Sequence, residues 1–95
     1  MDKNFTVTYW NKEAEQLLGK KREEVLFKNL WELYSELQDS EFNRQYHKAL
    51  ETGETVLFED YNPLISKWFE VTAYPSKEGL SVYFKDITLR KEADL

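Results

Sequence analysis

Few residues in this 95-residue sequence can carry chemistry. There is one histidine, His47, and no cysteine, which excludes disulfides, thiolate nucleophiles and cysteine metal sites. A Ser-His-Asp triad would have to use His47. A transition-metal site is also disfavoured, because such sites draw several imidazole or thiolate ligands. We therefore expect no metal site and no catalytic triad.

Asp60 is the most informative carboxylate. Strand alternation points it toward the helices beside Phe58, where an unpaired carboxylate is costly. It needs a partner, water or a ligand, unless it lies at the rim and reaches solvent. With Tyr34 or Tyr46 as a donor, it could act as the base of a small α+β cone enzyme. We prefer a non-catalytic domain, because carboxylates and tyrosines are common enough to occur together by chance.

Composition indicates one folded domain. Hydrophobic residues make up 41% of the chain and aromatic residues 16%, which is typical of a globular protein. A net charge of −5 argues against a nucleic-acid partner. No apolar run is long enough to span a bilayer and no signal peptide is visible. We expect no membrane contact and a cytoplasmic location.

Helical periodicity fills the first half of the chain after a strand expected at residues 6–10. Asn11 and Gly19 are suited to begin and end the first helix. Further helices are expected at about residues 21–26, 30–37 and 41–52. Residues 55–62, 67–75 and 80–87 alternate as strands joined by short connections. The pattern predicts an α+β fold with an antiparallel three-strand meander.

Alternation divides the side chains of these strands between two faces. The face toward the helices, together with the apolar stripes of the helices, gives the candidate ligand pocket: Tyr34, Phe42, Tyr46, Phe58, Asp60, Asn62, Phe69, Val71, Val82 and Phe84. The opposite face would be polar if it met only water, yet it is rich in apolar side chains. We expect a second copy, a flanking helix or both to cover it, unless its aromatics are simply good strand formers. The candidate partner residues are Leu57, Tyr61, Trp68, Tyr74, Tyr83 and Ile87.

Several segments together resemble the PAS domain family across almost the whole chain. They are the helix unit from Asn11 to Gly19, the WFEVTAYP strand closed by Pro75, the Gly79 turn and the terminal Asp86-Ile87-Thr88. The resemblance implies a PAS fold, with an antiparallel sheet in the order 2-1-5-4-3 and several short helices on one face. It also implies one PAS domain over residues 1–88 and the start of a C-terminal signalling helix at residues 89–95.

Two departures from the family pattern bear on the fold. PAS domains normally begin with a strand that lies in the middle of the sheet, and residues 1–5 supply only a stub of it. We therefore expect an N-terminally truncated domain, in which the sheet closes without that strand or another chain fills the gap. Phe27 stands where many members carry glycine, so the turn there is expected to be bulkier or differently shaped.

This chain has few residues that could bind the cofactors known from PAS domains. Without cysteine, the adduct chemistry of flavin light sensors is excluded. A haem would need His47, which lies further along its helix than the family's haem ligand. Haem and flavin are both disfavoured, and we expect no resident cofactor. A non-covalent small ligand remains compatible with the sequence.

The resemblance implies a sensory or signal-relay module of a larger signal-transduction protein, such as a histidine kinase, that acts as a homodimer. Asp86, Ile87 and Thr88 would form the junction to a signalling helix and to a kinase or cyclase output domain, with Asp86 bracing the junction and Thr88 capping the helix that begins at Leu89. The alternative is a PAS domain that docks a different protein without a ligand.

Overall fold

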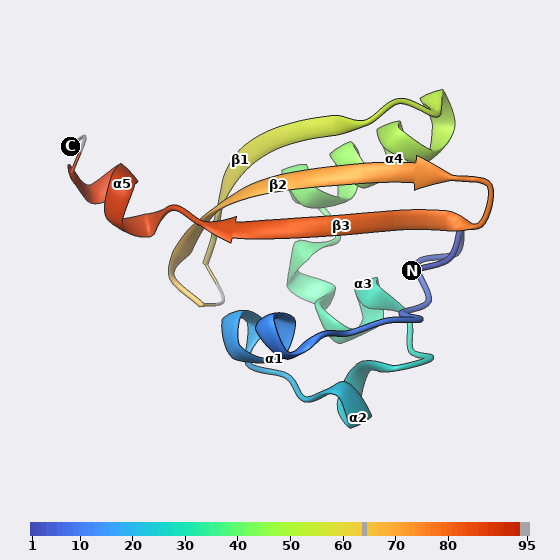
Figure 1. The fold of residues 1–95 in the computed structure, drawn as a ribbon, viewed down its shortest axis with the longest axis horizontal. Helices are drawn as coiled ribbons and strands as arrows, with labels where there is room; N and C mark the ends of the chain where they lie inside the picture. Colours follow the sequence, from blue (N-terminus) through green and yellow to red (C-terminus); the bar gives the residue numbers. More distant parts are fainter. Residues whose placement is uncertain (64, 94–95) are drawn as a thin grey trace.

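The computed structural model describes residues 1–63 and 65–93, with short helices up to residue 52 and three strands after it (Figure 1). The helical segments are α1 (Lys12–Leu18), α2 (Arg22–Val25), α3 (Leu30–Leu33), the 3-10 turn η1 (Ser35–Leu37) and α4 (Glu41–Thr52). The strands β1 (Val56–Asn62), β2 (Lys67–Ser76) and β3 (Gly79–Asp86) precede a last helix, α5 (Thr88–Ala93). The predicted α+β order of helices followed by a three-strand meander is confirmed. No helix in the described part of the chain has both the length and the hydrophobicity needed to cross a bilayer.

Local signals set the ends of the helices. The side chains of Asn11 and Ser40 accept hydrogen bonds from the first turns of α1 and α4 and so cap them. Gly19 and Gly53 follow the same helices with φ of 75° and 71°, in the left-handed region that favours glycine. The helix expected over residues 30–37 breaks at Tyr34, whose φ of −126° and ψ of 60° are not helical. Two short segments therefore replace it.

The three strands form one antiparallel sheet in the order β1-β2-β3. Val71 in β2 lies opposite Phe58 on one side and Phe84 on the other, and it is fully buried. Helix α4 packs against all three strands, and Figure 1 shows α1, α2 and α3 beyond the edge of the sheet formed by β3. The predicted division of the strands into a core face and an outer face is confirmed along β1, β2 and β3.

The strand expected at residues 6–10 does not join this sheet. Thr6 forms a single bridge with Asn29, and Val7 forms two backbone hydrogen bonds with residues 27 and 28. In the family order this segment would pair with the first strand. In the structure it pairs with the loop before α3.

The stub pairs with the beginning of β3. Met1 and Leu80 exchange two backbone hydrogen bonds of 2.9 and 2.8 Å, and Asp2 forms a bridge with Gly79. Gly79 has a φ of 151°, and a Cβ at this position would lie 2.1 Å from the carbonyl oxygen of Met1. Only glycine allows the two backbones to come so close.

Candidate functional site

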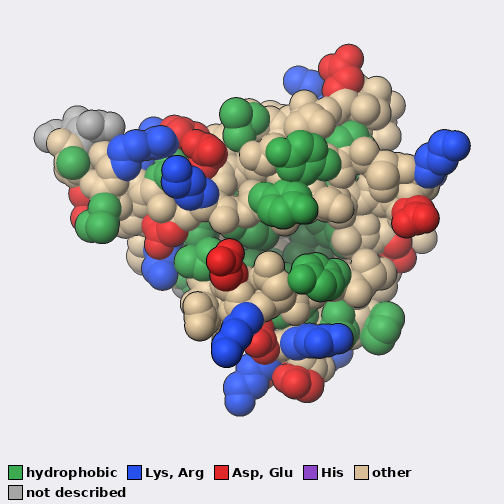
Figure 2. Space-filling view, in the orientation of Figure 1, with side chains coloured by type: hydrophobic (Ala, Val, Ile, Leu, Met, Phe, Trp, Pro, Cys, Tyr) green, Lys and Arg blue, Asp and Glu red, His purple; other side chains and the backbone are tan. Residues whose placement is uncertain are grey.

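A pocket of about 240 Å³ lies between the helices and β3. Its wall is built by α1, α3, η1, α4, β3, the end of β1 and the segment before α1. Six of the ten predicted pocket residues line it: Tyr34, Phe42, Tyr46, Asn62, Val82 and Phe84. Figure 2 shows a hollow near the middle of this side of the molecule, with hydrophobic side chains around it.

Three apolar residues predicted for the pocket do not line it. Phe69 and Val71 lie on the central strand β2 and are completely buried. The ring of Phe58 packs edge-on against Phe42, with 5.6 Å between the ring centroids. Side-chain packing therefore fills the space over β1 and β2, and the pocket is displaced toward β3.

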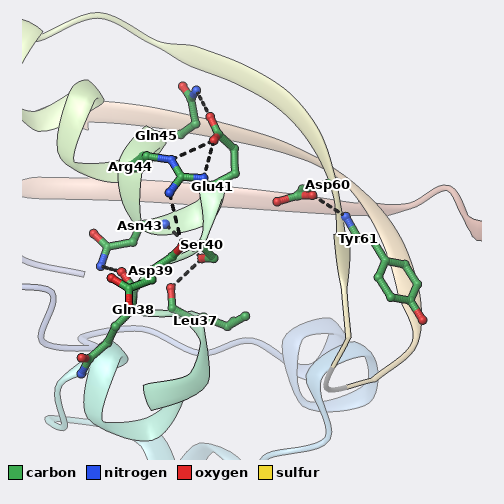
Figure 3. A network of polar contacts seen from close by, with 10 residues as sticks. All are labelled: Leu37, Gln38, Asp39, Ser40, Glu41, Asn43, Arg44, Gln45, Asp60 and Tyr61. Atoms are coloured by element: carbon green, nitrogen blue, oxygen red, sulfur yellow. Dashed lines mark hydrogen bonds and ion pairs between the residues drawn. The ribbon is translucent and has the colours of Figure 1, made fainter.

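Asp60 does not line the pocket either. Its Oδ1 accepts a hydrogen bond of 2.8 Å from the backbone nitrogen of Tyr61, and Figure 3 shows this pair apart from the polar network at the start of α4. Tyr34 and Tyr46 do lie on the pocket wall. Because the carboxylate is not there with them, the arrangement considered for a cone enzyme is not assembled.

The polar network in Figure 3 holds the first turn of α4, the helix that carries Phe42 and Tyr46 into the pocket wall. Glu41 accepts hydrogen bonds from Gln45 at 2.6 Å and from Arg44 at 3.0 Å. These bonds, first that of Gln45 and then that of Arg44, lower the pKa of Glu41. The network fixes the helix from its exposed side and leaves its apolar face to the pocket.

Two tryptophans on the pocket wall, Trp10 and Trp31, were missed from the sequence. Trp10 donates a hydrogen bond of 2.9 Å to the carbonyl of Lys20. Trp31 lies three residues before Tyr34, and residues at this spacing share a helix face. The helical periodicity of the sequence could therefore have predicted that Trp31 lines the pocket with Tyr34. The indole nitrogen of Trp31 and the hydroxyl of Tyr34 are buried and have no hydrogen-bond partner among the described residues.

The pocket lining includes one carboxylate, Glu13, and four phenols, of which those of Tyr34 and Tyr46 are buried. Burial, with a smaller contribution from Glu24, raises the pKa of Tyr34 to about 12. Burial also raises the pKa of Tyr46. Both phenols are therefore neutral near pH 7, and a wall of this kind suits an uncharged, largely apolar ligand better than an acid-base reaction.

His47 lies outside the pocket wall. It is exposed on α4, and its ring centroid is 4.7 Å from that of Phe5. In the part of the chain that the structure describes, no group of three or more His, Cys, Asp or Glu side chains is arranged to hold a metal ion.

The sheet face opposite the helices carries exposed apolar side chains. Leu57 and Tyr83 are each 65% exposed and Tyr74 is 46% exposed. Leu57 and Tyr83 flank Thr72 across the three strands. The rings of Tyr74 and Tyr83 lie 5.5 Å apart and nearly perpendicular. Three of the six predicted partner residues, Leu57, Tyr74 and Tyr83, therefore form one group, called the outer patch below.

The other three predicted partner residues lie near α5. Tyr61 and Trp68 are in ring contact at 5.6 Å, and Lys91 of α5 lies 5.1 Å from the Trp68 ring. Ile87 is only 3% exposed, so the expectation that it is part of the exposed face is wrong. Strand β3 ends at Asp86 and the chain turns into α5 at this point, so strand alternation no longer sets the direction of Ile87.

The residues between β3 and α5 form a hydrogen-bonded junction. Asp86 Oδ1 accepts bonds from the backbone nitrogen and the hydroxyl of Thr88, at 2.9 and 2.6 Å. These bonds, with a smaller effect of Lys67, lower the pKa of Asp86. The Thr88 hydroxyl also accepts a bond of 3.0 Å from the backbone nitrogen of Trp68. Helix α5 begins at Thr88 rather than Leu89, and Thr88 ties the junction to β2 instead of capping the helix. Residues 94–95 of the expected helix lie outside the described residues.

Basic side chains of α5 contact an acidic pair on the outer face. Glu59 and Glu70 lie directly opposite each other on β1 and β2, where like charges repel. Arg90 forms ion pairs with both carboxylates, at 3.9 Å for Glu70. Lys91 lies 2.7 Å from Glu59, and its hydrogen bond is the main cause of the lowered pKa of Glu59. The sequence analysis did not predict these contacts, because they depend on the register of two strands and the turn into α5.

Comparison with known proteins agrees with this architecture. A family model described as the PAS fold matches residues 1–84. The PAS domain of the histidine kinase ThkA is similar, with a TM-score of 0.76 and 28% identity, over 90% of this chain and 93% of that one. An RNA-binding light-oxygen-voltage receptor is similar with a TM-score of 0.69 and 26% identity, over 92% of this chain and 27% of its own.

Comparison with curated proteins found no match. The family match covers most of the chain, and the three-strand antiparallel sheet with several short helices agrees with a PAS fold. Domains of this kind are generally non-catalytic sensory modules of signal transduction. The chain belongs to the PAS domain family.

Proposed function

We propose that this chain is a sensory or signal-relay module of a larger signal-transduction protein, a histidine kinase or a similar regulator, and that it passes its signal through α5. The observation that carries the proposal is the junction of β3 and α5. Hydrogen bonds of Asp86 and Thr88 and the ion pairs of Arg90 tie the start of α5 to the sheet. A change in the sheet therefore changes the position of α5. A kinase or cyclase output domain beyond α5 and a cytoplasmic location belong to the same proposal.

The module acts as a homodimer in this proposal, and the outer patch is the contact surface. Leu57, Tyr74 and Tyr83 are too exposed and too close together to be explained by strand propensity alone. The patch lies on the same sheet face as the α5 contacts with Glu59 and Glu70. Dimer contact and helix position are thereby coupled through one surface.

The pocket offers a second input. Its mostly apolar wall, with the neutral phenols of Tyr34 and Tyr46, supports a small, non-covalently bound ligand, and we propose no resident haem, flavin or metal. A signal can then enter by ligand binding or by contact with a neighbouring domain, and in both cases it leaves through α5. Docking of a different protein on the outer patch is the alternative, and it predicts a monomeric chain.

The test is the oligomeric state of a double variant, Leu57→Lys with Tyr83→Lys, measured by light scattering. Both side chains are exposed, so the core should be kept and the thermal midpoint should change little. The unmodified chain should be a dimer and the double variant a monomer. Phe27→Lys is the matched control, because Phe27 is 78% exposed but lies off the sheet. A double variant that stays dimeric, or an unmodified chain that is monomeric, contradicts dimerisation through the outer patch.

A further inference from the structure

Two hydrogen-bond donors on the helical wall of the pocket have no acceptor in the described part of the chain. They are the indole nitrogen of Trp31 and the hydroxyl of Tyr34, and both atoms are buried. The two residues are only 8% and 7% exposed, and both line the pocket. A donor that is removed from water and left unpaired costs free energy. A ligand that supplies an acceptor would recover that free energy.

The groups that contact the two rings do not supply the acceptor. The rings of Phe5 and Tyr46 pack against the ring of Trp31, with centroid distances of 5.5 and 5.7 Å. The ammonium group of Lys20 lies over the ring of Tyr34, 5.4 Å from its centroid. An ammonium group only donates hydrogen bonds, so it cannot pair with the hydroxyl proton.

Trp31 and Tyr34 are placed to act on the same ligand. They lie three residues apart, a spacing at which helical residues share a face. Both polar atoms are covered by the protein, so a ligand reaches them when the two side chains turn toward the pocket. The pocket, of about 240 Å³, has room for this turn and for a small molecule. A carbonyl oxygen has two lone pairs and can accept from one donor or from both.

We propose that the pocket binds a neutral, largely apolar carbonyl compound, a ketone or an ester, whose oxygen accepts hydrogen bonds from Trp31 and Tyr34. The proposal rests on the proposed function of the pocket as a ligand site and adds the chemical class of the ligand.

The charges of the wall favour a neutral carbonyl over an anionic acceptor. Among the described residues, no Lys, Arg or His side chain lines the pocket, whereas Glu13 does. A carboxylate or phosphate group would therefore be buried without a counter-charge, which is costly. Burial raises the pKa of Tyr34 to about 12, so its phenol keeps its proton and remains a donor near pH 7.

A matched pair of probes tests the recognition of the carbonyl group. Propiophenone has a carbonyl group where propylbenzene has a methylene group. A wall without free donors would bind propylbenzene more tightly, because the ketone oxygen would leave water and find no partner. With the donors of Trp31 and Tyr34, propiophenone should bind at least as tightly as propylbenzene in NMR titrations of the unmodified chain. Tighter binding of propylbenzene would overturn the proposal.

The indole N–H signals show which donor is used. Propiophenone should shift the Nε1–H signal of Trp31 downfield, and propylbenzene should not; the loss of this signal in Trp31→Phe assigns it. Trp10 also lines the pocket but already donates to the carbonyl of Lys20 at 2.9 Å, so its signal is the internal control. A Trp31 signal that responds equally to both probes would overturn the proposal.

Tyr34→Phe removes the second donor and keeps the ring. The ratio of the Kd of propylbenzene to the Kd of propiophenone should fall about five- to tenfold in this variant. Tyr61→Phe is the matched control, because its hydroxyl lies outside the pocket wall, and it should leave the ratio unchanged. Thermal midpoints report whether both variants fold. An unchanged ratio in Tyr34→Phe would overturn the proposal.

A third probe tests the charge of the ligand. 3-Phenylpropanoate, an anion of similar size, should bind more weakly than propiophenone, and tighter binding would overturn the neutral class. If both neutral probes bind with equal responses at Trp31, carbonyl recognition is wrong and the pocket remains a ligand site. If neither neutral probe binds, the proposed ligand input fails together with carbonyl recognition.

Discussion

Thr88→Val removes one hydroxyl from the junction between the sheet and α5 and keeps the shape of the side chain. In the unmodified chain this hydroxyl donates to Asp86 at 2.6 Å and accepts from the backbone nitrogen of Trp68 at 3.0 Å. The variant leaves the part-buried N–H of Trp68 without its acceptor, a loss of about 1–3 kcal/mol. Asp86 keeps its hydrogen bond from the backbone nitrogen of residue 88, so the lost bond to Asp86 makes only a small contribution to the loss of stability.

The expected total is a loss of about 2 kcal/mol in the free energy of unfolding, which lowers Tm by roughly 8–16 °C in a domain of this size. Urea unfolding followed by tryptophan fluorescence measures it. Thr8→Val, at an exposed threonine outside the sheet, is the control and should change stability by less than about 0.5 kcal/mol. Exchange of the Trp68 amide should accelerate only in Thr88→Val.

The loss in the free energy of unfolding caused by Thr88→Val should also depend on pH. Because hydrogen bonds from Thr88 hold the pKa of Asp86 below its usual value, the stability that these bonds contribute is fully present above the pKa of the unfolded chain and is lost as pH falls through the lowered pKa. The difference between Thr88→Val and the unmodified chain should therefore decrease in acid only by the small contribution of the Asp86 bond, while the larger loss at the Trp68 N–H should persist. A loss of stability no larger than that of Thr8→Val would refute the role assigned to this junction.

Three further predictions address the turn before α3, the start of β3 and the pocket wall. Phe27 is 78% exposed and has a φ of 64°. Phe27→Gly should relieve about 1–2 kcal/mol of left-handed strain and cost about 0.5–1 kcal/mol in backbone entropy, so it should increase the free energy of unfolding. A lower urea midpoint would contradict this gain in stability. Gly79→Ala should destabilise the chain by about 1–3 kcal/mol and speed exchange at the Leu80 amide, because its Cβ collides with Met1; unchanged exchange would show that the stub pairing is absent. Tyr34 should titrate at about pH 12 in an absorbance titration, so the free energy of unfolding should decrease as pH rises above about 10, where the phenol ionises first in the unfolded chain. The titration step near pH 12 should be missing in Tyr34→Phe, and a step that persists in this variant would disprove the assignment.

Local signals predicted those parts of the fold that depend on neighbours in sequence. Asn11 and Gly19 bound α1 as expected because caps and left-handed glycines act within one turn. The two faces of the sheet followed from alternation, and the buried Val71 lies where parity placed it. Phe27, which stands where PAS domains often carry glycine, does adopt positive φ. These features need no knowledge of tertiary contacts.

Features that depend on distant neighbours were not predictable in the same way. Residues 6–10 have strand composition, but in the structure the segment pairs with residues 27–29 and does not join the sheet, a pairing with no signal in the local sequence. Asp60 has the right parity for the pocket, yet core packing displaces the pocket toward β3. The sequence pattern of β3 places Ile87 on the outer face, but β3 ends at Asp86 and the backbone turns there, so the side chain of Ile87 is buried. Trp31 was within reach of the helical period and was overlooked.

Native mass spectrometry of the unmodified chain, with an absorption spectrum of the same sample, tests the central claim most directly. The proposed signalling module works through its outer face and holds no resident haem or flavin. The predicted result is a dimer, with or without a small colourless ligand, and no visible absorption band. A monomer at every concentration, or a coloured cofactor that remains bound, would contradict it.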